Sequence, residues 1–343
     1  MYSIYFLFSV IVILIITLVI QIRGKVTVLP AVLLTVLIIY FLLNPKQCID
    51  ASLRGAELFV QAVLPTLLPF MVVCNLLISY EGITLYGKLF SHIICTPFKL
   101  SKNASFPIIA GIICGNPIGS KYSSDLYKQG YLEFNEYSRL IILSSNTGPL
   151  FLVGSVGSVM LQNKNYGYFL LGVNYISMIL IGLMTMGDKS CHNKKNDSKP
   201  AVKAGFGTIF KDALENAVMN TLNISGYVII FSVLISIVRD SYFFNYFSSS
   251  ISSLLNIPDE ALKGGLLGLI EITNGCKIIS SSSLCITVKL CILCFLTSFC
   301  GLSVLAQISS FCSRHKVNLK KYLMYKFIQG IMAGTIAFIF LST

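Results

Sequence analysis

Charged side chains are scarce in this sequence, and their scarcity excludes most classes of soluble protein. Asp, Glu, Lys and Arg make up 12% of the 343 residues, whereas about 25% is usual in a soluble domain. Residues 4–22 and 26–43 are nearly uninterrupted apolar runs, and each approaches the ~20 residues that a helix needs to span a bilayer. The composition therefore predicts a multi-pass integral membrane protein that is all-α.

The patterns of the common enzyme classes are also missing. The sequence has no G-x-S-x-G, H-E-x-x-H or P-loop pattern, and it has only three histidines for acid–base chemistry. Cys291 and Cys294 form a C-x-x-C pair, but no second pair or His pair stands at zinc spacing. We therefore expect no enzyme activity, no cofactor and no metal site.

The formal net charge of +12 does not indicate a nucleic-acid partner. The lysines lie in loops between apolar segments, where the positive-inside rule places them. Residues 188–203 and 312–321 are the two most basic of these loops. The expected partner is thus the lipid bilayer, with both loops in the cytoplasm.

A polar, Lys/Asn/Ser-rich stretch at 187–205 divides the chain and predicts a cytoplasmic linker. Before it, we expect two transmembrane helices in 1–43, a polar link at 44–52, and a first repeat at 53–186 in which 126–139 is a surface connection. After it, we expect a second repeat at 206–343 that ends in a span at 322–341.

The first repeat contains two apolar segments that are interrupted, at 115–119 and at 144–149. In hydrocarbon, an interrupted helix leaves N–H and C=O groups bare unless protein or a polar cavity covers them. The second repeat has breaks of its own at 271–275 and 298–303. Paired breaks of this kind are typical of transporter substrate sites. The residues expected at the breaks are Gly115, Pro117, Gly119, Gly148, Pro149, Gly275 and Gly301.

Short motifs recur between the two halves in the same order. Ala62-Val63-x-x-Thr66-Leu67 returns as Ala217-Val218-x-x-Thr221-Leu222, and Gly111…Lys121 has a counterpart in Gly268…Lys277. The segment at 148–151 likewise matches 301–304 at a nearly constant offset. We therefore predict an internal repeat.

Four stretches in order, GNPIGSK (115–121), NTGPLFLVGSVG (146–157), LIEITNGCK (269–277) and GLSVLAQISSF (301–311), resemble signatures of the YlbJ (SpoVV) family of sporulation integral membrane proteins. That family lies in the nucleoside-recognition (Gate) superfamily. The resemblance runs from about residue 53 to 335. The chain departs from it at Asn116, where the family commonly has Tyr, and at 305–307, where a His is common.

The resemblance implies a fold similar to concentrative nucleoside transporters, with two inverted repeats, re-entrant helical hairpins and broken helices. It also implies transport of dipicolinate (pyridine-2,6-dicarboxylate) across the outer forespore membrane during sporulation. The implied ligand is therefore a small aromatic dicarboxylate. A coupling ion and a homo-oligomeric state are left open.

Dipicolinate is a flat dianion, so its burial needs positive potential and donors for four carboxylate oxygens. The half-helices that begin near Pro117 and Gly148 would supply both. Lys121 would add a full charge, or else snorkel to the headgroups. Asn146 and Thr147 would donate, or else cap the break locally. The candidate substrate-binding residues are Asn116, Ser120, Lys121, Ser145, Asn146, Thr147, Thr273, Asn274, Ser303 and Gln307.

Glu271 lies in an apolar stretch of the sequence. Burying a carboxylate in a membrane costs free energy, so Glu271 is a candidate functional residue. Three roles compete: coupling transport to a proton or cation, pairing with Lys121 or Lys277, and capping a hairpin end. Gln307 would offer its amide to the pyridine ring, or else bond a bare carbonyl.

Two further functions compete with dipicolinate transport. The same scaffold would also suit a nucleoside or another small organic anion, and a neutral nucleoside would not need Lys121. A non-transporting protein of spore-envelope assembly is the other alternative, although it would need neither a buried carboxylate nor paired breaks.

Overall fold

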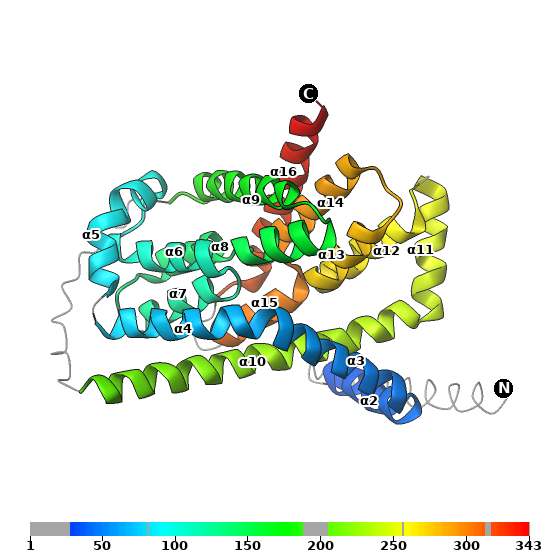
Figure 1. Ribbon diagram of the computed structural model, residues 1–343, viewed down its shortest axis with the longest axis horizontal. Coiled ribbons are helices and arrows are strands. Elements are labelled where there is room, and N and C mark those ends of the chain that lie inside the picture. The colour runs from blue at the N-terminus through cyan, green and yellow to red at the C-terminus, as the bar shows by residue number, and fades with distance from the viewer. Residues whose placement is uncertain (1–27, 81, 188–204, 256, 313–316, 343) are drawn as a thin grey trace. The chain divides into compact units, whose positions relative to one another are not determined.

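The computed structural model describes residues 28–80, 82–187, 205–255, 257–312 and 317–342, and these form helices joined by short links (Figure 1). The expected helix at 4–22 and nearly all of the linker at 187–205 lie outside these residues. Four described helical segments are long and apolar enough to cross a membrane, or five if one bent pair near the start counts as a single span. The predicted all-α polytopic class is therefore confirmed, whereas the inverted repeats and the likeness to nucleoside transporters stay predictions.

The chain divides into two compact units, Met1–Ser52 and Leu53–Thr343. The first contains α2 (Val28–Leu43) and most of α3 (Pro45–Leu58). The predicted polar link at 44–52 is thus wrong, because a helix begins at Pro45. Proline suits the first position of a helix, where its missing N–H would have no partner. Cys48 and Ala51, three residues apart, are buried on one face of α3.

The second unit begins with the end of α3, which is followed by a π-helical turn and a further helix. A π-helical turn at Phe59–Val63 leads into α4 (Leu64–Ser79), which contains Pro69. The remaining elements before residue 187 are α5 (Gly82–Ile94), η2 (Thr96–Phe98), η3 (Lys102–Ala104), α6 (Ser105–Cys114), α7 (Ile118–Lys128), α8 (Phe134–Ser144), the π-helical η4 (Leu150–Met160) and α9 (Lys164–Met184).

After residue 205 the order of elements follows a similar course. The helices are α10 (Phe206–Asp240), α11 (Tyr242–Leu255), α12 (Asp259–Ile270), α13 (Ile272–Ser281), α14 (Ile286–Phe299), α15 (Gly301–Cys312) and α16 (Leu319–Ser342). In each half, two broken helices are followed by one continuous helix: α6–α7, α8–η4 and α9, and then α12–α13, α14–α15 and α16.

The expected surface connection at 126–139 is confirmed only in its middle, because both of its ends are helical. α7 continues to Lys128 and α8 begins at Phe134. Tyr137 is fully buried and stacks on Tyr127 with ring centroids 4.5 Å apart. Glu136 is also buried, and its Oε1 accepts from the Ser101 N–H at 2.5 Å. Residues 128–130 and 133–135 are exposed, as expected of a connection, whereas Glu136 and Tyr137 lie inside the unit.

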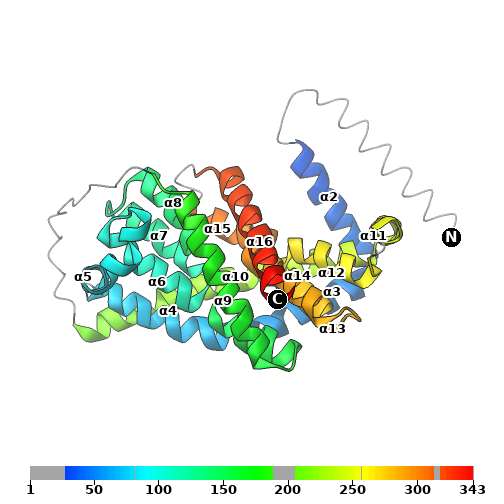
Figure 2. The same cartoon turned by 90° about the horizontal axis from the view of Figure 1, so that it is seen from above.

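Long helices frame the broken ones. α4 and α10 run side by side (Figure 1), and the Asn75 side chain donates to the Ala213 carbonyl between them at 3.0 Å. α16 packs against both α9 and α14 (Figure 2). The four broken helices are thus held between continuous helices, where protein rather than lipid can cover their interrupted backbone.

Candidate functional site

The first two breaks pack directly against each other. α6 ends at Cys114, Gly115 has a φ of +81°, and α7 starts after a cis Asn116–Pro117 bond. A Cβ on Gly119 would overlap the Ser144 carbonyl oxygen at the second break. Gly119 was expected at the break itself, but it lies inside α7, and its role is to let the two backbones approach.

The last two breaks form a second such pair. Glu271 alone separates α12 from α13, and Cys300 alone separates α14 from α15. The φ values of Cys300 and of Gly301, the first residue of α15, are 72° and 80°. A Cβ on Gly301 would lie 3.2 Å from the Ile270 carbonyl oxygen. Gly275, expected at a break, lies inside α13, where it packs against Gly268.

Side chains join the two pairs of breaks across the halves of the chain. The Asn116 Nδ2 donates to the Cys300 Sγ at 2.9 Å. The Thr147 hydroxyl donates to the Thr297 carbonyl at 2.6 Å and lies 3.6 Å from the Cys300 Sγ. These contacts connect residues at least 150 positions apart, so the breaks of both halves meet at one place.

A cavity of about 580 Å³ opens where the breaks meet. Asn116, Thr147, Glu271 and Cys300 each bring one break to its wall. The lining also includes apolar side chains from α4, η4, α10 and α15: Leu67, Leu150, Phe151, Ile224, Val228 and Val304. Its size and mixed lining are typical of a site for a small molecule.

Five of the ten candidate substrate-binding residues line this cavity. They are Asn116, Thr147, Thr273, Ser303 and Gln307. The other five do not. Ser120, Ser145 and Asn146 are fully buried behind the wall, and Asn274 bonds Glu271 instead.

Lys121 is not placed to meet a ligand in the cavity. Its Nζ lies 3.0 Å from the Asp125 Oδ2, one helical turn along α7, and 4.5 Å from the Tyr122 ring centroid. Its side chain is 9% exposed, so it does not snorkel into solvent either. The structure thus pairs Lys121 with Asp125 at i+4 and does not place it on the cavity wall.

Glu271 caps α13. Its Oε1 accepts from the Thr273 N–H at 2.9 Å, and its Oε2 accepts from the Asn274 N–H at 2.9 Å and the Asn274 side chain at 2.8 Å. The predicted ion pair with Lys121 or Lys277 is absent from the part of the chain that the structure describes. Of the three proposed roles, the geometry shows the cap, and Glu271 is also one of the residues that line the cavity.

The sequence interpretation missed Lys326 and Gln329 of α16, which are both fully buried. Lys326 donates to the Ser145 carbonyl and to the Gln329 Oε1 at 2.7 Å. The Gln329 Nε2 in turn donates to the Asn146 Oδ1 at 3.1 Å. The available signal was a lysine and a glutamine three residues apart in an apolar final span.

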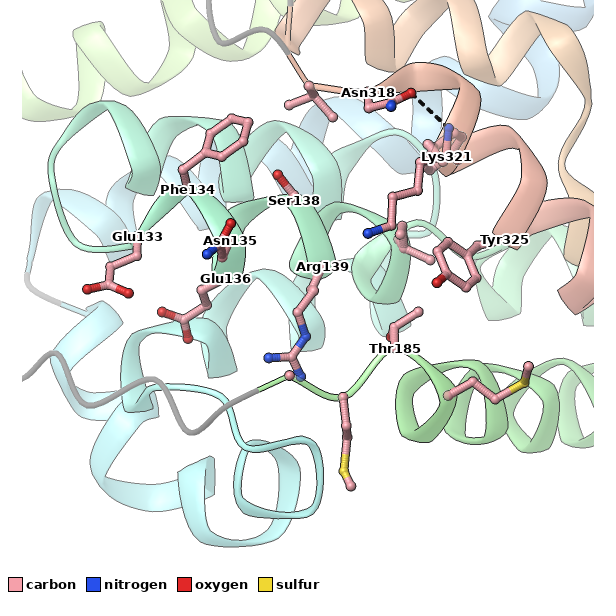
Figure 3. A pocket seen from close by; sticks show the side chains of 16 residues that line it. Glu133, Phe134, Asn135, Glu136, Ser138, Arg139, Thr185, Asn318, Lys321 and Tyr325 are labelled. Atoms are coloured by element: carbon pink, nitrogen blue, oxygen red, sulfur yellow. Dashed lines mark hydrogen bonds between the residues drawn. The ribbon is translucent and has the colours of Figure 1, made fainter.

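A second cavity, of about 600 Å³, lies beside the ends of α8, α9 and α16. Figure 3 shows Glu136 and Arg139 of α8, with Lys321 and Tyr325 of α16, around it. Tyr322 also lines this cavity, and its hydroxyl lies 2.7 Å from the Ser145 Oγ, which donates to the Asn116 Oδ1 at 2.5 Å. Three hydrogen-bonded residues thus lie between the two cavities.

Comparison with known proteins gives one relative. Over 313 residues the chain is 26% identical to the sporulation integral membrane protein YlbJ of Bacillus subtilis, and the match covers 85% of this chain and 77% of that protein. No family model matches the chain. No solved structure matches it either. The similarity supports the family resemblance and the multi-pass membrane location.

Proposed function

We propose that this chain, which belongs to the YlbJ family of sporulation integral membrane proteins, carries dipicolinate across the outer forespore membrane. The relative's name places it in a membrane and in sporulation, and goes no further. Transport and the choice of dipicolinate are therefore our proposal.

The meeting of four helix breaks at one cavity carries the proposal. Interrupted helices deep in a membrane protein are costly unless their free backbone groups are covered or line a polar cavity. Here each of the four breaks brings at least one residue to the same wall. This arrangement is the one that secondary transporters use to hold a substrate between two halves of the fold.

The lining suits a flat ring with polar edges. Leu67, Phe151 and Val304 offer apolar surface for the faces of a pyridine ring. Hydroxyl and amide groups of Asn116, Ser303 and Gln307 line the same cavity and can serve as donors to carboxylate oxygens.

A neutral nucleoside is the second candidate, and one observation favours it. Glu271 lines the cavity, whereas no lysine or arginine does so among the described residues. A carboxylate in the wall repels a dianion unless positive charge lies nearby. The two candidates therefore differ in whether the cavity prefers charged or uncharged ligands.

Uptake into liposomes tests the proposal. The full chain is reconstituted, and uptake of labelled dipicolinate is compared with uptake of uridine. Ser303→Phe fills the cavity from a residue that is 3% exposed. Leu302→Phe is the control, because it places the same side chain at the neighbouring position, which is 40% exposed and does not line the cavity.

The proposal is supported if the wild-type chain takes up dipicolinate, Ser303→Phe abolishes this uptake and Leu302→Phe preserves it. Uptake of uridine without uptake of dipicolinate would instead support a nucleoside as the substrate. If neither compound crosses the membrane, transport of these ligands is refuted and an assembly role gains ground.

A further inference from the structure

Lys326 is the one fully buried lysine in the described part of the chain. It lies in α16, and its ammonium is held by oxygen atoms at the second break and on its own helix. The acceptors are the Ser145 carbonyl, the Gln329 Oε1 at 2.7 Å and the Asn146 Oδ1 at 3.5 Å. All three oxygens are neutral.

Among the described residues, no carboxylate pairs with this ammonium. None of the ion pairs between described residues includes Lys326. Its other neighbours in the network, Tyr322 and Ser177, carry hydroxyl groups. Burying a charge without a counter-charge costs free energy. In a membrane protein, such a residue is therefore a candidate for a functional role.

The ammonium lies directly behind the wall of the cavity. Ser145 and Asn146 precede Thr147 and Gly148, which line it. Because consecutive Cα atoms are about 3.8 Å apart, the charge lies on the order of 10 Å from a ligand held there. The Ser145 hydroxyl also donates to Asn116, another lining residue, at 2.5 Å.

We infer that Lys326 is the fixed positive charge that makes this cavity selective for organic anions. The inference rests on the proposed function, in that it requires a small organic ligand in the cavity. It supplies the positive charge that the lining lacks and that Lys121 does not provide. Lys326 acts through the field across the wall, so it is a positioning and selectivity residue that need not touch the ligand.

If Lys326 acts through its electric field, the effect of removing it should increase with the charge of the ligand. At about 10 Å and an effective dielectric constant near 20, each unit of ligand charge changes affinity by about tenfold. Removing the charge should therefore weaken the binding of a dianion by about 100-fold and that of a monoanion by about tenfold. The binding of a neutral ligand should not change. A purely structural role for Lys326 predicts an equal loss for all three.

Three isosteric ligands provide the test. Binding of dipicolinate, its monoamide and its diamide to the purified full chain is measured by calorimetry, with the melting temperature recorded for each variant. Lys326→Met removes the charge and Lys326→Arg keeps it.

Gln329 allows a second, gentler perturbation. Gln329→Glu places a carboxylate against the Lys326 ammonium, where the amide oxygen now lies 2.7 Å from Nζ. The substitution keeps the shape of the side chain, and its negative charge cancels the field of Lys326 at the cavity. Gln329→Met is the matched control, because it also loses the amide hydrogen bonds but adds no charge.

A charge-graded loss in Lys326→Met and Gln329→Glu, with smaller changes in Lys326→Arg and Gln329→Met, is the expected result. If Lys326→Met does not fold, the two Gln329 variants decide. Equal losses for all three ligands, or equal dipicolinate binding by Gln329→Glu and Gln329→Met, would overturn the inference while the proposed function stands. A wild-type chain that binds none of the three ligands would overturn both.

Discussion

Replacing Glu271 with Gln tests the capping geometry at the third break. The carboxylate now accepts from three donors: the N–H groups of Thr273 and Asn274, and the Asn274 side chain. A carboxylate has only acceptors, so it satisfies all of them. Gln replaces one oxygen with an NH₂ group, which is itself a donor.

The size of the effect follows from this count. If the Gln oxygen takes the place of Oε2, it keeps both Asn274 donors and leaves the Thr273 N–H facing an NH₂ group. A buried donor left unsatisfied costs about 1–3 kcal/mol. The opposite orientation leaves two donors unmatched and costs more. We expect Glu271→Gln to lower the free energy of unfolding by about 1–3 kcal/mol.

Denaturant unfolding of the purified protein measures this change. Glu215→Gln is the control, because Glu215 is 63% exposed in its pairing with Lys211 and its replacement should cost less than about 0.5 kcal/mol. Glu271→Gln with wild-type stability would refute the cap. Uptake by the same variant across pH tests the coupling role separately, since an unchanged rate and pH dependence would exclude it.

Three further substitutions test other contacts. Lys121→Gln should change dipicolinate affinity less than about fivefold, as judged from the ~1 kcal/mol ceiling of a local pair, because Lys121 pairs with Asp125 outside the cavity; a loss well above tenfold by calorimetry would contradict that placement. Gly119→Ala should cost about 1–3 kcal/mol from overlap with the Ser144 backbone, whereas Gly172→Ala, which has open space, should cost nothing in the same unfolding assay. Tyr322→Phe removes the contact with Ser145 and should cost about 0.5–1.5 kcal/mol, and unchanged stability would show that this bond is not formed.

The helix breaks could be predicted from the sequence because their causes are local. Pro117 removes a donor, and the stretch from Ser145 to Pro149 cannot continue a helix. The ends of α6, α8 and α14 accordingly lie where the sequence indicates. The positions of Gly119 and Gly275 were misjudged, because close approach between helices and interruption of a helix both favour glycine.

The charges of the site could not be predicted, because pairing depends on which helices meet. Lys121 stands beside a signature motif, yet Asp125 neutralises it at i+4. Lys326 stands in a plain apolar span, yet it lies against a break 181 positions away in sequence. Nothing within α16 indicates that contact, so sequence spacing singled out Lys121 and did not point to Lys326.

One crosslinking measurement tests most directly whether the breaks of the two halves meet. Thr147→Cys places a thiol beside native Cys300, whose Sγ lies 3.6 Å from the Thr147 hydroxyl, and mild oxidation followed by peptide mass spectrometry identifies the partner of residue 147. Ser120→Cys is the control, because Ser120 is fully buried, does not line the cavity and donates to the Ile141 carbonyl. We predict a disulfide from residue 147 to Cys300 and none from residue 120 to Cys300. A residue-147 thiol that stays free, or that pairs with a different cysteine, would contradict the convergence of the breaks.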